Sequence, residues 1–140
     1  MKSCFHNLKK TNERGKSMED RRIILVVDDS SANLQLCRGL LSNDYDVRLA
    51  KSGKMALDAL SKIRPDIILL DIEMPDMTGF EVMNEIKKDD NLKGIPVIFV
   101  TSHASEKLVL KALGHGAVDY IVKPFVSDVL YEKINKAFNG

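Results

Sequence analysis

Short apolar runs alternate with longer amphipathic stretches from residue 23 to the end of the chain. The runs at residues 23–27, 67–70, 97–100 and 118–122 are rich in β-branched residues and mostly continuous, which is typical of strands buried on both faces. A weaker run at residues 45–49 alternates between apolar and polar positions and therefore predicts a strand at the edge of a sheet. The pattern predicts five short strands.

The stretches between these runs have helical periodicity. Apolar residues recur every three or four positions within residues 34–41, 55–60, 80–87 and 126–138, and a shorter, less regular stretch covers residues 107–113. Strands that alternate with helices in this way predict an α/β fold with a parallel sheet and right-handed crossovers.

One of these helices has a capping motif at its start. Thr78 and Glu81 have the spacing at which each side chain hydrogen-bonds the backbone N–H of the other residue. A helix is therefore predicted to begin directly after Thr78.

The composition is that of one folded domain. The chain has 140 residues, of which 44% are hydrophobic and 29% are charged, and this apolar content excludes a wholly disordered protein. No apolar run approaches the ~18 residues that a membrane-spanning helix needs. The first residues also lack the apolar segment of a secretory signal. We therefore expect a cytoplasmic protein that does not contact a membrane.

The formal net charge of +1 is unevenly distributed along the chain. Residues 1–22 carry seven basic and three acidic side chains, a net charge of +4, so the other 118 residues sum to −3. We expect residues 1–21 to be a basic, disordered leader and residues 22–140 to form the domain. A near-neutral chain with a mildly acidic domain is not expected to contact nucleic acid directly.

Polar side chains follow four of the five predicted strands. Asp28 and Asp29 follow the first strand, Asp71 the third, Thr101 the fourth and Lys123 the fifth. Ligands of parallel α/β sheets bind beyond the carboxyl ends of the strands, which share one edge. Acidic residues near a single strand end are common because loops are polar. The whole set, in chain order, indicates a functional site.

These groups favour phosphate chemistry with a divalent cation. Carboxylates about 4 Å apart repel one another, and a cation relieves that repulsion. Oxygen ligands without a neighbouring histidine or cysteine favour Mg²⁺, with Mn²⁺ as an alternative, over zinc. With the metal and Lys123 neutralising an incoming phosphate, Asp71 can attack phosphorus and become an aspartyl phosphate. Thr101 can then hydrogen-bond a phosphoryl oxygen.

Four sequence blocks around these residues are similar to those of a known family. The blocks are VVDDS at residues 26–30, ILLDIEMPDMTG at 68–79, VTS at 100–102 and YIVKPF at 120–125. In this order and spacing they resemble the CheY-like response regulator receiver domain of two-component signalling, over residues 22–138. The resemblance implies a doubly wound, flavodoxin-like α/β fold, with a five-stranded parallel sheet in the order 2-1-3-4-5 and five helices.

The resemblance also implies a role for each site residue. The implied roles are Mg²⁺ ligands (Asp28, Asp29, Asp71 and the backbone carbonyl of Glu73), phosphoacceptor (Asp71), phosphate-binding lysine (Lys123), switch hydroxyl (Thr101), switch aromatic (Tyr120), a cis peptide bond before Pro124, and two positions that tune the lifetime of the phosphoryl group (Glu73 and His103). None of these positions departs from the family pattern.

A phosphoryl group would change the charge at the strand ends and bias a nearby surface. We expect Thr101 and Lys123 to move toward it and Tyr120 to enter the space that Thr101 leaves. The affected surface is formed by the fourth helix, fifth strand and fifth helix. It is expected to include or adjoin Lys107, Val109, Lys111, His115, Tyr120 and residues 122–126.

The resemblance implies protein partners rather than an external substrate. A sensor histidine kinase or phosphotransfer protein would donate the phosphoryl group, and a downstream protein target or output domain would respond to it. The chain would catalyse only its own phosphorylation and dephosphorylation, as a monomer or a phosphorylation-dependent dimer. We expect either a single-domain regulator or a receiver cut from a longer protein.

Three other interpretations remain open at this point. A flavodoxin-like electron carrier shares the strand–helix alternation, but its phosphate-binding loop would be repelled by Asp28 and Asp29. A Mg²⁺-dependent aspartyl-phosphate phosphohydrolase would need a general acid two residues after its nucleophile, where this chain has Glu73. A receiver-like scaffold that is never phosphorylated would not need the intact set of site residues.

Overall fold

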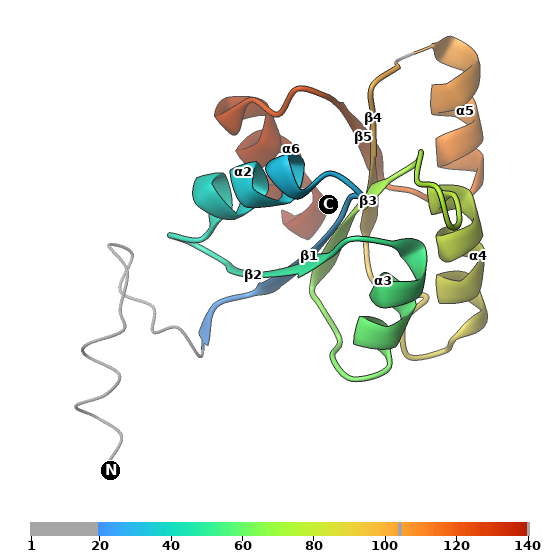
Figure 1. Ribbon diagram of the computed structural model, residues 1–140, viewed down its shortest axis with the longest axis horizontal. Helices are drawn as coiled ribbons and strands as arrows, with labels where there is room; N and C mark the ends of the chain where they lie inside the picture. The colour runs from blue at the N-terminus through green and yellow to red at the C-terminus, as the bar shows by residue number, and fades with distance from the viewer. Residues whose placement is uncertain (1–19, 104, 140) are drawn as a thin grey trace.

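A five-stranded parallel sheet forms the centre of the fold (Figure 1). The computed structural model describes residues 20–103 and 105–139. The strands are β1 (Ile23–Val27), β2 (Asp46–Ala50), β3 (Ile67–Asp71), β4 (Val97–Thr101) and β5 (Asp119–Val122). Their order is β2-β1-β3-β4-β5, and every neighbouring pair is parallel. The predicted sheet, its strand order and the edge position of the second strand are confirmed.

Five helices within the described residues cover the two faces of this sheet. Helices α2 (Ser31–Leu41) and α6 (Ser127–Asn139) lie on one face, and α3 (Gly53–Leu60), α4 (Gly79–Lys88) and α5 (Glu106–Gly114) lie on the other (Figure 1). The N-terminal leader expected at residues 1–21 lies, for residues 1–19, outside the described residues. Among the helices that the structure describes, none combines the length and apolarity needed to cross a membrane.

Each face of the sheet has its own hydrophobic core. Along β1, Leu25 and Val27 face α3 and α4, whereas Ile24 and Val26 face α2 and α6. Every residue of β3 and β4 is buried, as the continuous apolar runs predicted. The sheet therefore leaves polar groups mainly at the ends of its central strands, where the functional site is expected.

The strand boundaries differ by one residue from those predicted at several ends. The third and fourth strands extend to Asp71 and Thr101, which the apolar pattern excluded because both residues are polar. Asp71 pairs with Val100, and Thr101 pairs with Val122, so both belong to the sheet ladder. This pairing fixes the backbone of two candidate site residues within regular structure.

Hydroxyl side chains begin four of the helices. Ser30, Ser52, Thr78 and Ser105 are the N-caps of α2, α3, α4 and α5, and each accepts a hydrogen bond from a backbone N–H of the first turn. The capping box predicted at Thr78 is confirmed, because the Glu81 carboxylate also accepts the Thr78 N–H at 2.8 Å. These caps fix where each loop after a strand ends.

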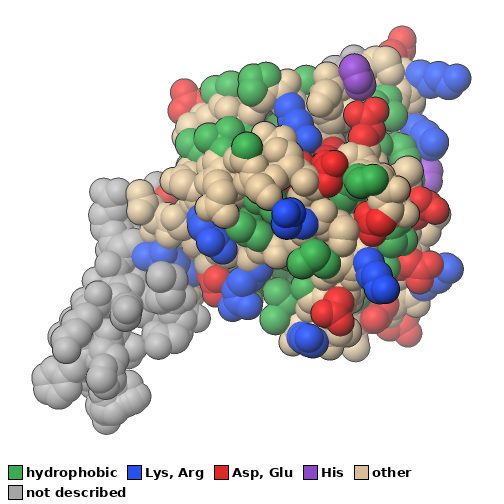
Figure 2. All heavy atoms as spheres, in the orientation of Figure 1, with side chains coloured by type: hydrophobic (Ala, Val, Ile, Leu, Met, Phe, Trp, Pro, Cys, Tyr) green, Lys and Arg blue, Asp and Glu red, His purple; other side chains and the backbone are tan. Residues whose placement is uncertain are grey.

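Charged side chains of both signs are interspersed over the molecule. Figure 2 shows Lys and Arg side chains among Asp and Glu side chains across the viewed face of the described part. Several form surface pairs, such as Lys88 with Glu85 at 3.1 Å and Lys93 with Asp90 at 3.0 Å. Exposed pairs of this kind contribute little to stability, so the packed cores carry most of it.

Replacing Gly79 with alanine is expected to destabilise the fold. A Cβ at Gly79 would lie 2.5 Å from the Asp71 backbone oxygen and 2.9 Å from the Ile72 Cα, and backbone cannot easily move away. We expect the free energy of unfolding to fall by about 1–3 kcal/mol in urea titrations. The matched control is Gly39→Ala inside α2, where nothing lies within 4 Å of the new Cβ. It should be neutral or stabilising, and equal midpoints for the two variants would contradict the steric argument.

Candidate functional site

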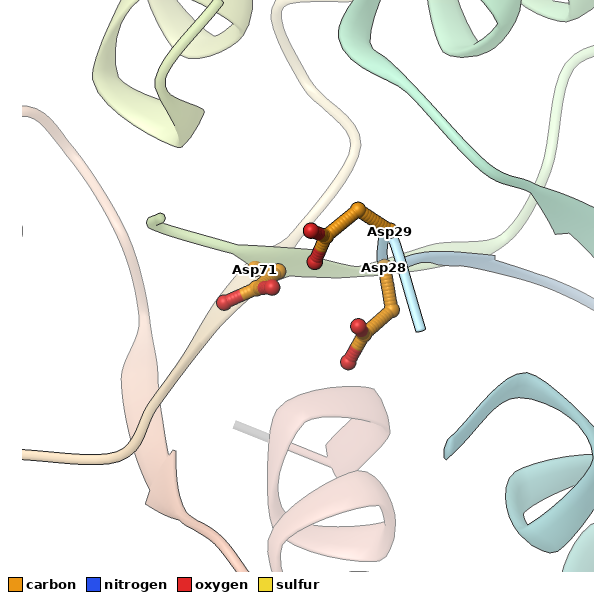
Figure 3. Close-up of side chains that lie close together, drawn as sticks. All are labelled: Asp28, Asp29 and Asp71. Carbon is orange, nitrogen blue, oxygen red and sulfur yellow. The ribbon is translucent and has the colours of Figure 1, made fainter. Parts of the chain in front are cut away.

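Three carboxylates lie together at one edge of the sheet (Figure 3). Asp28 and Asp29 directly follow β1, and Asp71 is the last residue of β3. Because Val27 pairs with Leu70, the two strand ends are adjacent. Each side chain offers one ligand atom, and these atoms all lie within 4.8 Å of one another. Asp28 and Asp71 are buried, at 1% and 2% exposure, whereas Asp29 is exposed.

Lys123 bridges the two buried carboxylates. Its Nζ lies 2.9 Å from Asp28 Oδ2 and 3.3 Å from Asp71 Oδ2. The lysine directly follows β5, and its backbone N–H donates to the carbonyl of Thr101 at 2.8 Å. The next peptide bond, Lys123–Pro124, is cis. Two of the three predicted carboxylates and the predicted ammonium are thus in direct contact.

The charges in this cluster are not fully compensated. Burial and the neighbouring charge of Asp28 raise the pKa of Asp71 from 3.8 to about 6, although Lys123 and the Glu73 N–H oppose the shift. Burial lowers the pKa of Lys123, but its contacts with Asp28 and Asp71 outweigh burial and raise that pKa. At neutral pH the lysine is cationic and Asp71 is mainly ionised. The cluster therefore keeps an excess of negative charge.

Local hydrogen bonds hold the two buried carboxylates in place. Asp28 accepts the Ser30 N–H at 2.9 Å and the Asn33 side-chain amide at 3.4 Å. Asp71 accepts the Glu73 N–H at 3.3 Å, so the Glu73 backbone lies beside it while the Glu73 side chain is exposed. The sequence analysis did not identify Asn33 as a partner of Asp28. Its position in the first turn of α2, five residues after Asp28, could have indicated this contact.

The predicted switch hydroxyl of Thr101 bonds to the backbone of His103, one of the two positions predicted to tune the phosphoryl lifetime. Thr101 is 2% exposed, and its hydroxyl donates to the His103 carbonyl at 3.0 Å. The same oxygen accepts the His103 N–H, also at 3.0 Å. The His103 side chain is exposed. The structure thus joins Asp28, Asp29, Asp71 and Lys123, and gives the Thr101 hydroxyl other partners.

Tyr120 lies in a groove beside α6, away from the carboxylates. The groove has a volume of about 500 Å³ and is lined by Leu113, Val118, Asp119, Tyr120, Lys133, Lys136 and Ala137. Lys133 Nζ lies 4.9 Å from the centre of the Tyr120 ring and 2.9 Å from Asp119 Oδ1. Asp119 also accepts the Tyr120 N–H at 2.8 Å. These contacts hold the half-buried Tyr120, and the sequence pattern gave no sign of Lys133.

The donor set fits a hard divalent cation. Its ligand atoms are carboxylate oxygens, two of the three side chains are buried, and Lys123 compensates only part of their charge. Mg²⁺ is held in proteins by a few carboxylates and keeps open positions for phosphate oxygens. Glu73, whose backbone carbonyl is the further predicted ligand, lies two residues after Asp71 in the chain. The chemistry of these groups therefore suits both a divalent cation and a phosphoryl group.

Comparisons with known proteins identify the family. Residues 24–135 match the family model of the response regulator receiver domain. The Vibrio cholerae protein named probable cyclic di-GMP phosphodiesterase is 39% identical over 95% of this chain, which covers 32% of that protein. The response regulator PleD of Caulobacter vibrioides is 38% identical over 79% of this chain, which covers 25% of it. The chain thus spans about a third or less of these relatives.

The fold is also similar to that of solved members of this family. The structure of the Vibrio cholerae chemotaxis protein CheY4 superposes with a TM-score of 0.80 at 30% sequence identity, and the match covers 84% of this chain and 98% of that one. The strand order, the acidic cluster and the family match all agree. The chain belongs to the response regulator receiver domain family, the phosphorylation-dependent switches of two-component signalling.

Proposed function

We propose that Asp71 accepts the phosphoryl group of this switch. The observation that carries the proposal is a buried carboxylate with a raised pKa, 3.3 Å from a lysine ammonium and grouped with two further carboxylates. In this proposal Asp28, Asp29, Asp71 and the backbone carbonyl of Glu73 hold Mg²⁺, with Mn²⁺ as a substitute. The bound cation screens negative charge on the acceptor and on the phosphoryl oxygens.

The transfer itself needs a nucleophile and a charge-stabilising cation. An Asp71 carboxylate oxygen attacks phosphorus as the bond from phosphorus to the histidine nitrogen of the donor breaks, and that nitrogen keeps the electron pair. The product is an acyl phosphate on Asp71. Lys123 already lies between Asp28 and Asp71, and its ammonium can move onto a phosphoryl oxygen without leaving the site. In this proposal Glu73 and His103, which are both exposed, influence how fast water removes the group.

The signal leaves the site through Thr101. In the proposed switch, its hydroxyl gives up the His103 carbonyl and donates to a phosphoryl oxygen, which is the stronger acceptor because it is charged. Tyr120 then leaves its contact with Lys133 and moves toward the vacated space. The surface formed by α5, β5 and α6, with Lys107, Val109, Lys111, His115 and residues 122–126 on or beside it, changes with it.

The partners follow from the family. A sensor histidine kinase or phosphotransfer protein donates the phosphoryl group, and a protein target or an output domain responds to the altered surface. We assign residues 22–140 to the receiver domain, residues 1–21 to a basic leader, and the chain to the cytoplasm. It turns over no external substrate, acts as a monomer or a phosphorylation-dependent dimer, and is either a single-domain regulator or part of a longer protein.

Asp71→Asn is expected to abolish phosphorylation. The amide lacks the nucleophilic carboxylate, so stoichiometric incorporation from acetyl phosphate with Mg²⁺ should fall by more than about 100-fold in intact-mass measurements. Asp90→Asn is the matched control, because the Asp90 side chain is 92% exposed and remote in sequence from the cluster. Label that persists in Asp71→Asn argues against Asp71 as acceptor, and sustained turnover of phosphomonoesters would favour a phosphohydrolase.

The stability of the metal-free protein is expected to fall as pH rises from about 4 to above 6. The folded state binds a proton on Asp71 more tightly than the unfolded state, so stability is lost as that proton leaves near pH 6. Relative to Asp71→Asn in EDTA, the loss over this window should be on the order of 1–3 kcal/mol in urea titrations. Saturating Mg²⁺ should remove most of it. A pH-independent difference between the two proteins would contradict the uncompensated charge.

Thr101→Ala is expected to uncouple the site from the surface. Beryllofluoride with Mg²⁺ should shift the amide resonances of Tyr120 and Val122 in the wild type. Loss of one hydrogen bond to a charged group should weaken beryllofluoride binding about 10-fold and shrink those shifts. Thr101→Ser, which keeps the hydroxyl, should retain both effects. Unchanged shifts in the alanine variant would exclude Thr101 as the relay.

A further inference from the structure

Asp76 lies outside the carboxylate cluster but joins the loop after Asp71 to a neighbouring helix. Its Oδ1 accepts the Gly53 N–H at 3.2 Å, and its Oδ2 accepts the Lys54 N–H at 3.0 Å. Both amides belong to the first turn of α3, which has no acidic residue of its own there. These backbone contacts lower the pKa of Asp76, the Lys54 amide most of all. A distant carboxylate thus completes this helix start.

Apolar contacts hold the same loop against the same helix start. Gly53 is buried, and a Cβ at this position would overlap the Met77 side chain and lie 2.9 Å from Val82 Cγ2. Glycine therefore lets Met77, the residue after Asp76, pack directly on α3. The loop of residues 72–78 is docked by a pair of hydrogen bonds and by close packing at adjacent positions.

The start of α3 is also tied to the acidic pair. Asp28 donates its backbone N–H to the carbonyl of Ala50 at 3.1 Å, and Ala50 is the last residue of β2. Only Lys51 and Ser52 separate Ala50 from α3. This short connection links the residues after β1 to the start of α3, on which the loop that carries Glu73 is docked.

The loop itself has little freedom once its far end is fixed. The Gly79 N–H donates to the Ile72 carbonyl at 2.8 Å and closes residues 72–78 into a compact turn. The Glu73 N–H donates to Asp71 Oδ1 at 3.3 Å. A contact at Asp76 therefore restricts the position of the Glu73 backbone, although Asp76 does not touch the cluster.

We propose that Asp76 is a positioning residue for the divalent cation. By tying residues 72–78 to the start of α3, it holds the Glu73 carbonyl in place relative to Asp28 and Asp29 and so sets the affinity for Mg²⁺. The inference rests on the proposed function, in which this carbonyl and these carboxylates are the ligands. The Asp76 carboxylate is not part of the carboxylate cluster, and its two oxygens accept the Gly53 and Lys54 amides.

Ser52 offers a control for a purely structural role. Its hydroxyl caps the same helix end by accepting the Met55 N–H at 3.0 Å, but it belongs to the connection before α3 and not to the loop. If Asp76 acted only by stabilising α3, then Ser52→Ala and Asp76→Ala would have the same consequences for cation binding.

Calorimetric titration of Mg²⁺ into the full chain separates these roles. Asp76→Ala should weaken binding about 10-fold, as removal of an outer partner of a metal ligand does. Asp76→Asn should be intermediate, because it keeps one acceptor oxygen. Ser52→Ala should stay within about twofold of the wild type while lowering the urea midpoint about as much as Asp76→Ala. Equal losses in Ser52→Ala and Asp76→Ala, or no loss in Asp76→Ala, would overturn the inference.

A second variant tests docking without removing a cap. Gly53→Ala favours α3 by helix propensity but forces Met77 away from it. It should weaken Mg²⁺ binding and change the amide resonances of Glu73 and Met74, and wild-type values for both would count against the inference. If the wild-type protein binds Mg²⁺ and is phosphorylated, and Asp76→Ala binds Mg²⁺ equally well, only the role of Asp76 is overturned. Wild-type protein that binds no Mg²⁺ overturns the proposed site and the inference together.

Discussion

The ammonium of Lys123 between two buried carboxylates is the interaction on which the site depends. Carboxylates as buried as those of Asp28 and Asp71 are costly unless a cation compensates them. Lys123 provides that charge at 2.9 and 3.3 Å, but one ammonium faces two carboxylates, with Asp29 close by. The raised pKa of Asp71 is the physical sign of what remains uncompensated. An edge with this excess of negative charge favours a divalent cation, and in the proposed function the same groups then stabilise an anionic phosphoryl group.

The parallel sheet is what brings these charges together. Neighbouring strands β1 and β3 end at the same edge, so residues 43 positions apart become neighbours through backbone pairing alone. The helices cover both faces of the central strands, which removes water from the base of the cluster and strengthens each charge interaction there. Lys123 follows β5, which β4 separates from β3, and its long side chain reaches across to both buried carboxylates. The fold therefore determines both which charges meet at this edge and how strongly they interact.

The sequence predicts which polar residues meet at the edge of the sheet better than it predicts their hydrogen bonds. The apolar runs and the polar residues that follow them were sufficient for the parallel sheet and the grouping of Asp28, Asp29 and Asp71, because strand pairing brings these positions together. The strand order came from the resemblance to the receiver family. The last residues of β3 and β4 were missed, since hydrophobicity cannot reveal that a polar residue is still paired. The contact between Asp76 and Gly53 spans 23 positions and depends on loop packing, for which local periodicity has no signal.

The hydroxyl of Thr101 illustrates the limit most clearly. The sequence predicts a hydrogen bond from this hydroxyl to a phosphoryl oxygen, but it does not predict the partners that it has now, which are backbone groups of its own turn at 3.0 Å. A neutral hydrogen bond contributes about 0.5–1.5 kcal/mol and one to a charged acceptor about 1.5–3 kcal/mol. In the proposed switch, exchange of the His103 carbonyl for a phosphoryl oxygen would gain only about 1–2 kcal/mol, roughly a tenfold shift between two arrangements. The contacts of Lys133 with Tyr120 and Asp119 are of similar size and oppose that shift. A switch made from such nearly balanced contacts responds to one added charge and returns when that charge is removed.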